Sequence, residues 1–251
     1  MRGAVVAICL TLAGWATVAP AQSKPAASTA AAVAATTTTT SPATRPAGAV
    51  VLFDGKDQST WLDKSGKPAA WKAVDGAIEA NGTGDIHTKD SYRDFVLHVE
   101  FRTPEPKPGQ TGQHRGNSGI YLDDRYEVQV LDSYGLEPTK GDCGAIYNQK
   151  APDVNACLPP LEWQTYDMTF RAPRFDAAGK KTENARLTLI WNGRKVHDNA
   201  EITGPTRSAS EKELPEGPIR LQDHGHPVQY RNIWIVPAPA ATTAPAAAPA
   251  K

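Results

Sequence analysis

The chain has 251 residues, and its 27 Lys and Arg residues are balanced by 27 Asp and Glu residues, so the formal net charge is zero. This balance argues against a nucleic-acid partner, which normally requires a basic face, but it leaves a neutral ligand such as a sugar open. The length allows one large domain or two small ones.

The N-terminus has the pattern of a secretory signal peptide. Arg2 precedes an apolar run over 4–19, and residues 19–21 (Ala-Pro-Ala) fit a small-residue cleavage site. The run is too short to favour a membrane span, and Cys9 lies inside it, too early to anchor a lipoprotein. We therefore expect a signal peptide over 1–21, no membrane span, and a periplasmic or secreted protein.

Segments of low complexity follow the signal peptide and end the chain. Residues 22–48 and 238–251 consist mainly of Ala, Thr and Pro. Such sequences bury too little apolar surface to offset their chain entropy, so both are expected to be disordered. The folded domain is then expected over 49–237, which is long enough for one sizeable core.

Within this domain, short β-branched and aromatic stretches are bounded by Gly, Pro, Asn or Asp, as strands are. We expect strands at 50–53, 71–74, 77–79, 95–102, 118–122, 126–131, 164–171, 186–191, 195–197, 219–222 and 228–235. Asp75-Gly76 and Asn192-Gly193 each separate two such stretches and predict type I′ hairpin turns, whose two central residues need positive φ. Sustained helical periodicity is absent from the sequence, which therefore predicts an all-β, single-domain sandwich or jelly roll.

Two of these strands combine an apolar face with a polar one. Glu127 and Gln129 share a face on one strand, and Arg220 and Gln222 share a face on another, which His224 joins if that strand continues. The simplest interpretation is a solvated outer face. These side chains, however, suit sugar hydroxyls better than the Lys, Thr and Ser that are usual on exposed strands.

A series of motifs along the domain resembles the 3-keto-disaccharide hydrolase family. In chain order they are 51–57, 71–76, 92–95, 116–121, 126–132, 144–147, 162–163, 191–193 and 221–225, the last leading to 230–233. Each motif is weak alone, but together they cover nearly the whole domain in the right order. The resemblance implies a concanavalin A-like β-sandwich and the extracytoplasmic degradation of sugars already oxidised to a ketone at C3.

The implied chemistry is an elimination followed by hydration. A C3 ketone acidifies the hydrogen on C2, a base removes it, the C1 substituent is expelled, and water then adds back. Such a site needs a base, an acid and donors for the enolate oxygen. The expected partners are a 3-keto sugar as substrate and a sugar 3-oxidoreductase that makes the ketone. No cofactor is expected, although a structural calcium stays open in this fold class.

The candidate catalytic residues are Glu127 and His224, as proton-transfer groups whose roles as base and acid the sequence does not assign. The candidate substrate-binding residues are Asn117, Gln129, Asp132, Tyr147, Gln222 and Arg231. Arg231 either supports an enolate oxygen or pairs with Asp132. A catalytic metal is not expected, since His114, Glu127, Asp132 and His224 lack a diagnostic ligand spacing.

Cys143 and Cys157 remain once Cys9 leaves with the signal peptide. In an oxidising compartment they can close a loop of about 15 residues, a bridge worth about 3 kcal/mol. The alternative is two separate buried thiols.

Two other functions compete with the elimination. An ordinary retaining glycosidase needs two carboxylates about 5 Å apart, but Gln129 stands at the alternate position after Glu127 and Asp132 has the other parity. A non-catalytic carbohydrate-binding module is the second, because the fold does not fix the function. Its stacking platform would be Trp61, Trp163 and Trp191.

Overall fold

The structure is a computed structural model that describes residues 44–206 and 212–238. The expected signal peptide and most of the two low-complexity segments lie outside these ranges. Strands dominate the described residues, with one short 3-10 helix, η1 (Gly112–His114). Over the same residues, no helix is long and apolar enough to cross a membrane.

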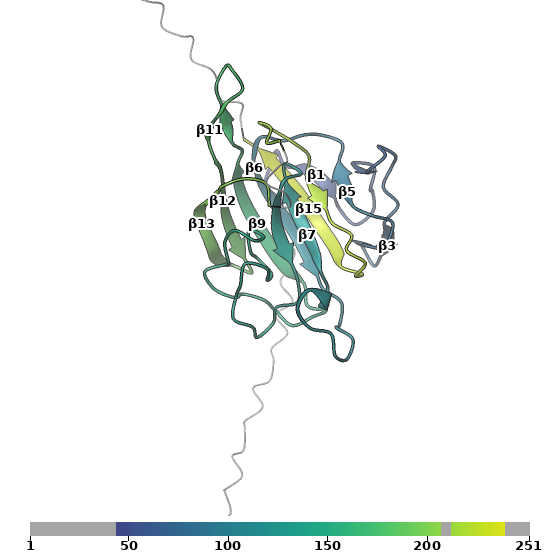
Figure 1. The fold of residues 1–251 in the computed structure, drawn as a ribbon. Coiled ribbons are helices and arrows are strands. Elements are labelled where there is room, and N and C mark those ends of the chain that lie inside the picture. Colours follow the sequence, from purple (N-terminus) through teal and green to yellow (C-terminus); the bar gives the residue numbers. More distant parts are fainter. Residues whose placement is uncertain (1–43, 207–211, 239–251) are drawn as a thin grey trace, which may run out of the picture. The chain divides into compact units, whose positions relative to one another are not determined.

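Eight strands form the larger sheet (Figure 1). Seven follow one another in the order β13 (Arg194–Ile202), β12 (Ala185–Trp191), β9 (Gln164–Arg171), β6 (Asp94–Arg102), β15 (Gln229–Pro237), β4 (Ala77–Glu79) and β3 (Lys72–Val74). The eighth, β1 (Val50–Phe53), pairs with the second half of β15. All of these pairings are antiparallel.

The smaller sheet has five antiparallel strands. Their order is β2 (Trp61–Asp63), β5 (Ile86–Thr88), β14 (Arg220–Leu221), β7 (Ser118–Leu122) and β8 (Tyr126–Val130). A separate pair, β10 (Arg174–Phe175) and β11 (Lys181–Glu183), forms a two-stranded ribbon.

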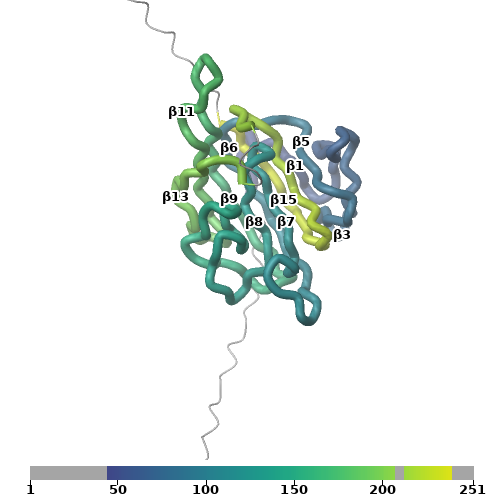
Figure 2. The backbone as a smooth tube through the Cα atoms, in the orientation of Figure 1, coloured from purple at the N-terminus to yellow at the C-terminus, as the bar shows by residue number. Residues whose placement is uncertain are grey.

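The two sheets share one hydrophobic core. Leu97 and Phe101 of β6 belong to the same buried cluster as Val128 of β8 and Leu221 of β14. In Figure 2 the tube of β7 and β8 lies over that of β9 and β15, the two layers that this core joins. Each such side chain contributes about 1.5–3 kcal/mol when it is removed from water. The predicted β-sandwich is therefore confirmed.

Both predicted hairpin turns are confirmed by the backbone. Asp75 and Gly76 have φ values of 48° and 76°, and Asn192 and Gly193 have φ values of 50° and 77°. These turns connect β3 to β4 and β12 to β13. The positive φ at both central residues is what a type I′ turn requires, so the turn residues set the register of these strands.

Four strands lie outside the predicted set, namely β2, β5, β10 and β11. Each is only two or three residues long, which is too short for an alternating pattern to emerge. In addition, β13 extends over Arg194–Ile202, well past the predicted 195–197. Its second half alternates exposed Asp198, Asn199 and Glu201 with buried Ala200 and Ile202, so it lacks the continuous apolar run on which the prediction depends.

Candidate active site

The register of the smaller sheet aligns four polar side chains in one row. Arg220 of β14 pairs with His87 of β5 on one side and with Tyr121 of β7 on the other. Tyr121 in turn pairs with Glu127 of β8. Directly opposed residues of an antiparallel sheet project to the same face. His87, Arg220, Tyr121 and Glu127 therefore follow one another across the face that points away from the core.

A glycine beside this row makes room for the Glu127 carboxylate. Gly119 lies on β7 opposite Gln129, and its carbonyl accepts a hydrogen bond of 2.9 Å from the Gln222 backbone N–H. A Cβ at Gly119 would stand only 2.5 Å from Glu127 Oε1. Glycine is thus the residue that lets Glu127 lie across its neighbouring strand.

A cavity of about 390 Å³ opens over this face. Its lining residues are Asp85, Gln113, Asn117, Tyr121, Glu127, Gln129, Tyr147, Gln222, Asp223 and His224. They come from β7, β8 and η1, from the segments next to β5, β7 and β14, and from the β8–β9 connection that carries Tyr147. Six of the eight predicted catalytic and substrate-binding residues are in this list, so the structure brings most of the predicted set together.

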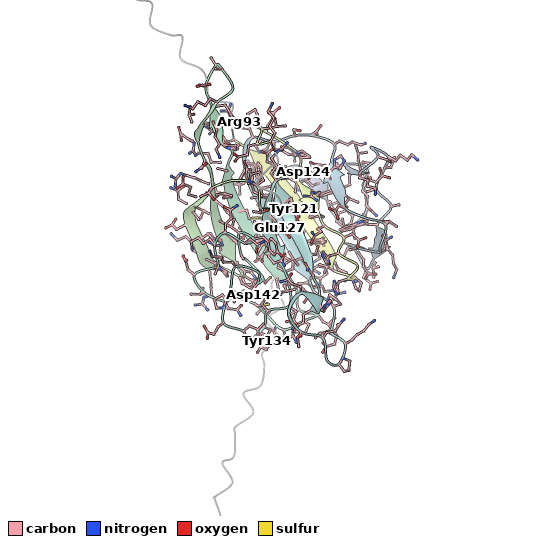
Figure 3. The ribbon with its side chains drawn as sticks, in the orientation of Figure 1. Arg93, Tyr121, Asp124, Glu127, Tyr134 and Asp142 are labelled. Atoms are coloured by element: carbon pink, nitrogen blue, oxygen red, sulfur yellow. The ribbon has the colours of Figure 1, made fainter. Side chains whose placement is uncertain are left out.

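Glu127 is the most enclosed carboxylate of the cavity, with 4% of its surface exposed. The Tyr121 hydroxyl donates to Glu127 Oε2 at 2.8 Å, and Gln222 Nε2 donates to the Tyr121 hydroxyl at 3.3 Å. Turning the Gln129 amide over also places its nitrogen 3.0 Å from Glu127 Oε1. Figure 3 shows Tyr121 and Glu127 side by side. These contacts hold the carboxylate in one orientation.

His224 lies at the exposed rim of the cavity, beyond the end of β14. Its ring stacks on His226, with centroids 6.3 Å apart and an interplanar angle of 14°. Burial, the neighbouring His224 and His114 together lower the pKa of His226, although backbone contacts oppose this. Within 44–206 and 212–238, no three His, Cys, Asp or Glu side chains are placed to hold a metal ion. The structural calcium stays an untested expectation.

An amide cluster closes another side of the cavity. Gln113 Oε1 accepts a hydrogen bond of 2.9 Å from Asn117 Nδ2 and lies 2.9 Å from the Gln129 side-chain amide. Gln113 Nε2 donates to the Gly141 carbonyl at 2.8 Å. The Tyr147 N–H donates to the Glu127 carbonyl at 3.1 Å, which ties the segment that carries Tyr147 to the edge of β8. The polar lining is therefore fixed by the fold before any ligand binds.

Comparison with known proteins assigns the chain to a family. Residues 48–236 match the model of the 3-keto-alpha-glucoside-1,2-lyase-like domain family. The chain belongs to this family. The resemblance carried by the sequence motifs is thereby confirmed.

Individual relatives agree with the family assignment. A 3-keto-disaccharide hydrolase of Bacteroides thetaiotaomicron is 25% identical over 228 residues, which cover 75% of this chain and 78% of that protein. A crystal structure of a candidate glycosyl hydrolase from Parabacteroides distasonis is 41% identical with a TM-score of 0.73, covering 78% of this chain and 86% of its own. A second structure from that organism is 21% identical with a TM-score of 0.57, covering 76% and 94%, which is a likeness of fold alone. The family and these relatives make the chain a glycosyl-hydrolase-like protein.

Four lining residues of this lyase-like domain are missing from the predicted set. Tyr121 carries a usable signal, because strand alternation and the short β7–β8 connection place it opposite Glu127. Gln113 lies in the single short turn η1, and Asp85 precedes the unpredicted β5, so neither has a local pattern. Asp223 follows Gln222, so a continued strand would turn it to the opposite face. It lines the cavity because β14 ends at Leu221.

The cavity also contains two further carboxylates, Asp85 and Asp223, which come from outside the strand of Glu127. Asp85 Oδ2 accepts from Arg220 Nη1 at 2.7 Å, and Asp85 Oδ1 accepts from the Asp223 N–H at 2.9 Å. Asp223 accepts from the N–H groups of Gly84 and Gly225 at 3.1 and 3.0 Å. Both carboxylates are thus engaged in holding the loops of the cavity. Asp85 precedes β5 and Asp223 follows β14, so the alternation of residues along the Glu127 strand does not predict them.

Two predicted residues lie outside the cavity. Asp132 is fully buried and forms an ion pair of 2.5 Å with Arg115 Nη2. Arg231 is on the outer face of the larger sheet, where its Nε donates to Glu100 Oε2 at 2.6 Å and its guanidinium covers the Trp163 ring at 3.9 Å. The two therefore do not pair with each other. Asp132 has the opposite parity to Glu127 along the chain and is buried. Arg231 belongs to β15 of the larger sheet, whereas Glu127 belongs to the smaller one.

The predicted disulfide is not present in the structure. Cys143 and Cys157 are free, buried thiols that interact with each other. Burial is the main cause that raises the pKa of Cys143 well above its usual value. Cys143 also lies 3.1 Å from the Tyr166 hydroxyl. The structure thus has two adjacent thiols, which differs both from a bridge and from two separate buried cysteines.

The three tryptophans considered as a stacking platform do not line the cavity. Trp61 and Trp191 are fully buried in the core, and Trp163 stacks under the guanidinium groups of Arg102 and Arg231. These positions give each ring a structural partner. The platform expected for a binding module is therefore not formed by these residues.

Proposed function

We propose that this protein cleaves glycosides whose C3 hydroxyl has been oxidised to a ketone, by elimination and subsequent hydration. The observation that carries the proposal is the Glu127 carboxylate, enclosed in a polar cavity and oriented by Tyr121 in a chain of the 3-keto-alpha-glucoside-1,2-lyase-like family. Proton abstraction beside a ketone needs one well-placed base in a site that can also bind hydroxyls.

The proposed reaction has two balanced stages. A base takes the proton from C2, the bonding electrons form the enolate of the C3 ketone, and a double bond forms between C1 and C2 as the C1–O bond breaks. The leaving oxygen receives a proton from an acid. Water then adds across the double bond, returning a hydrogen to C2 and placing a hydroxyl on C1. The net change is hydrolysis without an oxocarbenium ion.

Glu127 is assigned as the base and His224 as the acid. Glu127 is fixed deep in the cavity by its hydrogen bond from Tyr121, which suits a group that must meet one carbon-bound hydrogen. His224 is exposed at the rim, where an imidazole can exchange protons with water between turnovers.

Gln222 supports the assignment of a sugar-binding role to the cavity lining. Its Oε1 is buried and has no hydrogen-bond partner among the described residues. Buried polar atoms are rarely left unpaired unless a ligand or water completes them. A sugar hydroxyl would satisfy this acceptor, with Asn117, Gln129 and Tyr147 providing further contacts.

The direct test offers the purified protein a disaccharide and its 3-keto derivative side by side and measures release of the free sugar. The proposal predicts cleavage of the keto form alone. Cleavage of the unoxidised disaccharide alone would instead favour a retaining glycosidase that uses Asp85 or Asp223 as its second carboxylate. Binding of both sugars without cleavage of either would favour the binding module.

The proposed reaction also requires an earlier oxidation of the sugar and a compartment in which the two reactions meet. A sugar 3-oxidoreductase must supply the ketone, and we propose that both reactions take place outside the cytoplasm. N-terminal sequencing of the protein from its native host tests the second point. A mature chain that begins at Gln22 supports export, and an intact Met1 or Arg2 start in the soluble cell extract contradicts it.

A further inference from the structure

A second, larger cavity lies beside the candidate active site. It has a volume of about 680 Å³ and is lined by Lys64, His87, Arg220 and Lys212, among others. Asp85 lines both cavities. Nothing in the proposed elimination uses this second cavity.

The two cavities follow one another along the same sheet face. Arg220 and Gln222 are two residues apart on one strand face, a step of about 7 Å, and they line the second and the first cavity respectively. The Arg220 guanidinium covers the Tyr121 ring at 3.6 Å, so the wall between the cavities consists of these stacked groups. Figure 3 shows Asp124, Tyr121 and Glu127 in succession; Asp124 lines the second cavity, and Tyr121 and Glu127 line the first.

The second cavity has an excess of positive charge. Four of its lining residues are cationic and two, Asp85 and Asp124, are acidic. Both acids are engaged by Arg220, with ion pairs of 2.7 Å and 2.5 Å. Among the described residues, the ammonium groups of Lys64 and Lys212 have no carboxylate partner. Two uncompensated point charges therefore face this space.

We propose that the second cavity binds the leaving group of the substrate, and that this leaving group is a sugar bearing a carboxylate or a sulfate. The inference rests on the proposed function, because elimination in the first cavity breaks the C1–O bond and the released part must occupy adjacent space. Arg220, held by Asp85 and Asp124, forms the floor. Lys64 and Lys212 supply the charge that attracts the anion without dictating a bidentate geometry.

The kinetic test compares a 3-keto glucoside that releases glucose with one that releases glucuronate. In the Lys64→Gln/Lys212→Gln variant, KM for the glucuronate substrate should rise about tenfold, since each exposed charge pair contributes modestly. KM for the glucose substrate should change less than about twofold. Lys67→Gln, in the turn that carries Lys64, is the matched control and should leave both unchanged. An equal effect on both substrates, or no effect on either, overturns the proposal.

A binding test keeps the inference separate from the proposed reaction. Calorimetry with free glucose, glucuronate and glucose 6-sulfate needs no cleavage of a keto sugar. The wild-type protein should bind at least one of the two anions more tightly than glucose, the preference should fall with rising salt, and the double lysine variant should lose it. The tighter of the two identifies carboxylate or sulfate as the ligand group. Equal affinity for all three sugars contradicts the anionic subsite, whatever the protein does to keto sugars.

Discussion

Glu127 is the residue on which the proposed chemistry depends most. Replacing it with Gln keeps the shape and the hydrogen bond from Tyr121 but removes the base. General-base catalysis contributes about 10²–10⁴-fold, so Glu127→Gln should lower kcat on a 3-keto glycoside by roughly 10³-fold with little change in sugar affinity. Initial rates and calorimetric titrations measure the two quantities. A variant that keeps more than about a tenth of the activity would show that another group is the base.

Gly119 gives a second test at the scale of one atom. A Cβ there would meet Glu127 Oε1 at 2.5 Å, so Gly119→Ala must displace the carboxylate. A misplacement of about 1 Å can cost about 10²-fold in rate, and we expect a loss of this order in kcat. Gly204→Ala is the control, because a Cβ at Gly204 meets nothing within 4 Å. If both variants keep full activity, the position of Glu127 does not limit the reaction.

At the scale of elements, the outer face of the larger sheet contains a buried ionic cluster. His98 Nδ1 lies 2.6 Å from Asp167 Oδ1, the Trp234 ring stacks on His98 at 4.9 Å, and Arg231 pairs with Glu100. Burial would raise the pKa of Glu100, but the nearby His98 imidazole and hydrogen bonds from Asn232 and Arg231 outweigh it and lower that pKa to about 2. Burial would lower the pKa of His98, but Asp167 and Glu100 outweigh it and raise that pKa.

These two shifts predict opposite pH limits for the stability of the sheet. A carboxyl group with a lowered folded-state pKa stabilises above its unfolded value of 4.5, and this contribution is lost as the pH falls toward 2. A histidine with a raised pKa stabilises below its ordinary value of 6.5, and this is lost as the pH rises through the raised pKa. Stability from this cluster should therefore be greatest between these limits.

Glu100→Gln tests the acid limit. The variant should have a lower Tm than the wild type near pH 6, because the charges of Arg231 and His98 lose their partner. Its Tm should also fall less between pH 5 and pH 2.5, since the linked protonation is gone. Glu105→Gln, at an exposed position, should follow the wild-type curve. Parallel curves for wild type and Glu100→Gln would refute the linkage.

Sequence patterns predicted elements well where alternation extends over five or more residues. Strands β7 and β9 have the predicted bounds, and the polar faces that carry Glu127 and Gln222 are those expected. Short strands such as β5 are recognisable only through their partners, so Asp85 could not be found. Arg231 was assigned to the site because of its motif, but long-range pairing places it on the other sheet.

At the scale of the whole molecule, Cys143 and Cys157 place two parts of the long β8–β9 connection next to each other as free, buried thiols. In a chain with Cys9→Ala, the structure predicts two reactive thiols after unfolding in denaturant and almost none in the native state. Native reactivity is low because both thiols are buried away from the reagent, and burial also raises the pKa of Cys143, which disfavours its reactive thiolate. A thiol-specific chromogenic reagent counts the reactive thiols in the native and in the denatured protein. Zero thiols in denaturant would show that the bridge forms in the isolated protein.

The sandwich as a whole separates stability from chemistry. The larger sheet supplies one wall of the core and its own ionic cluster, whereas the polar face of the smaller sheet carries both cavities. Substitutions at Glu127 or Gln222 should therefore change catalysis more than Tm, since neither side chain belongs to the core.

The most direct measurement of the central claim follows deuterium from the solvent. The protein is given a 3-keto disaccharide in deuterated water, and the released keto sugar is analysed at C2 by mass spectrometry and NMR at early times. A sample of ready-made product, incubated for the same time, corrects for spontaneous exchange beside the ketone. Elimination and hydration predict one solvent deuterium at C2 with each cleavage, in step with product release and lost in Glu127→Gln. Product released by the wild type without deuterium at C2 would contradict proton abstraction and require a direct displacement at C1.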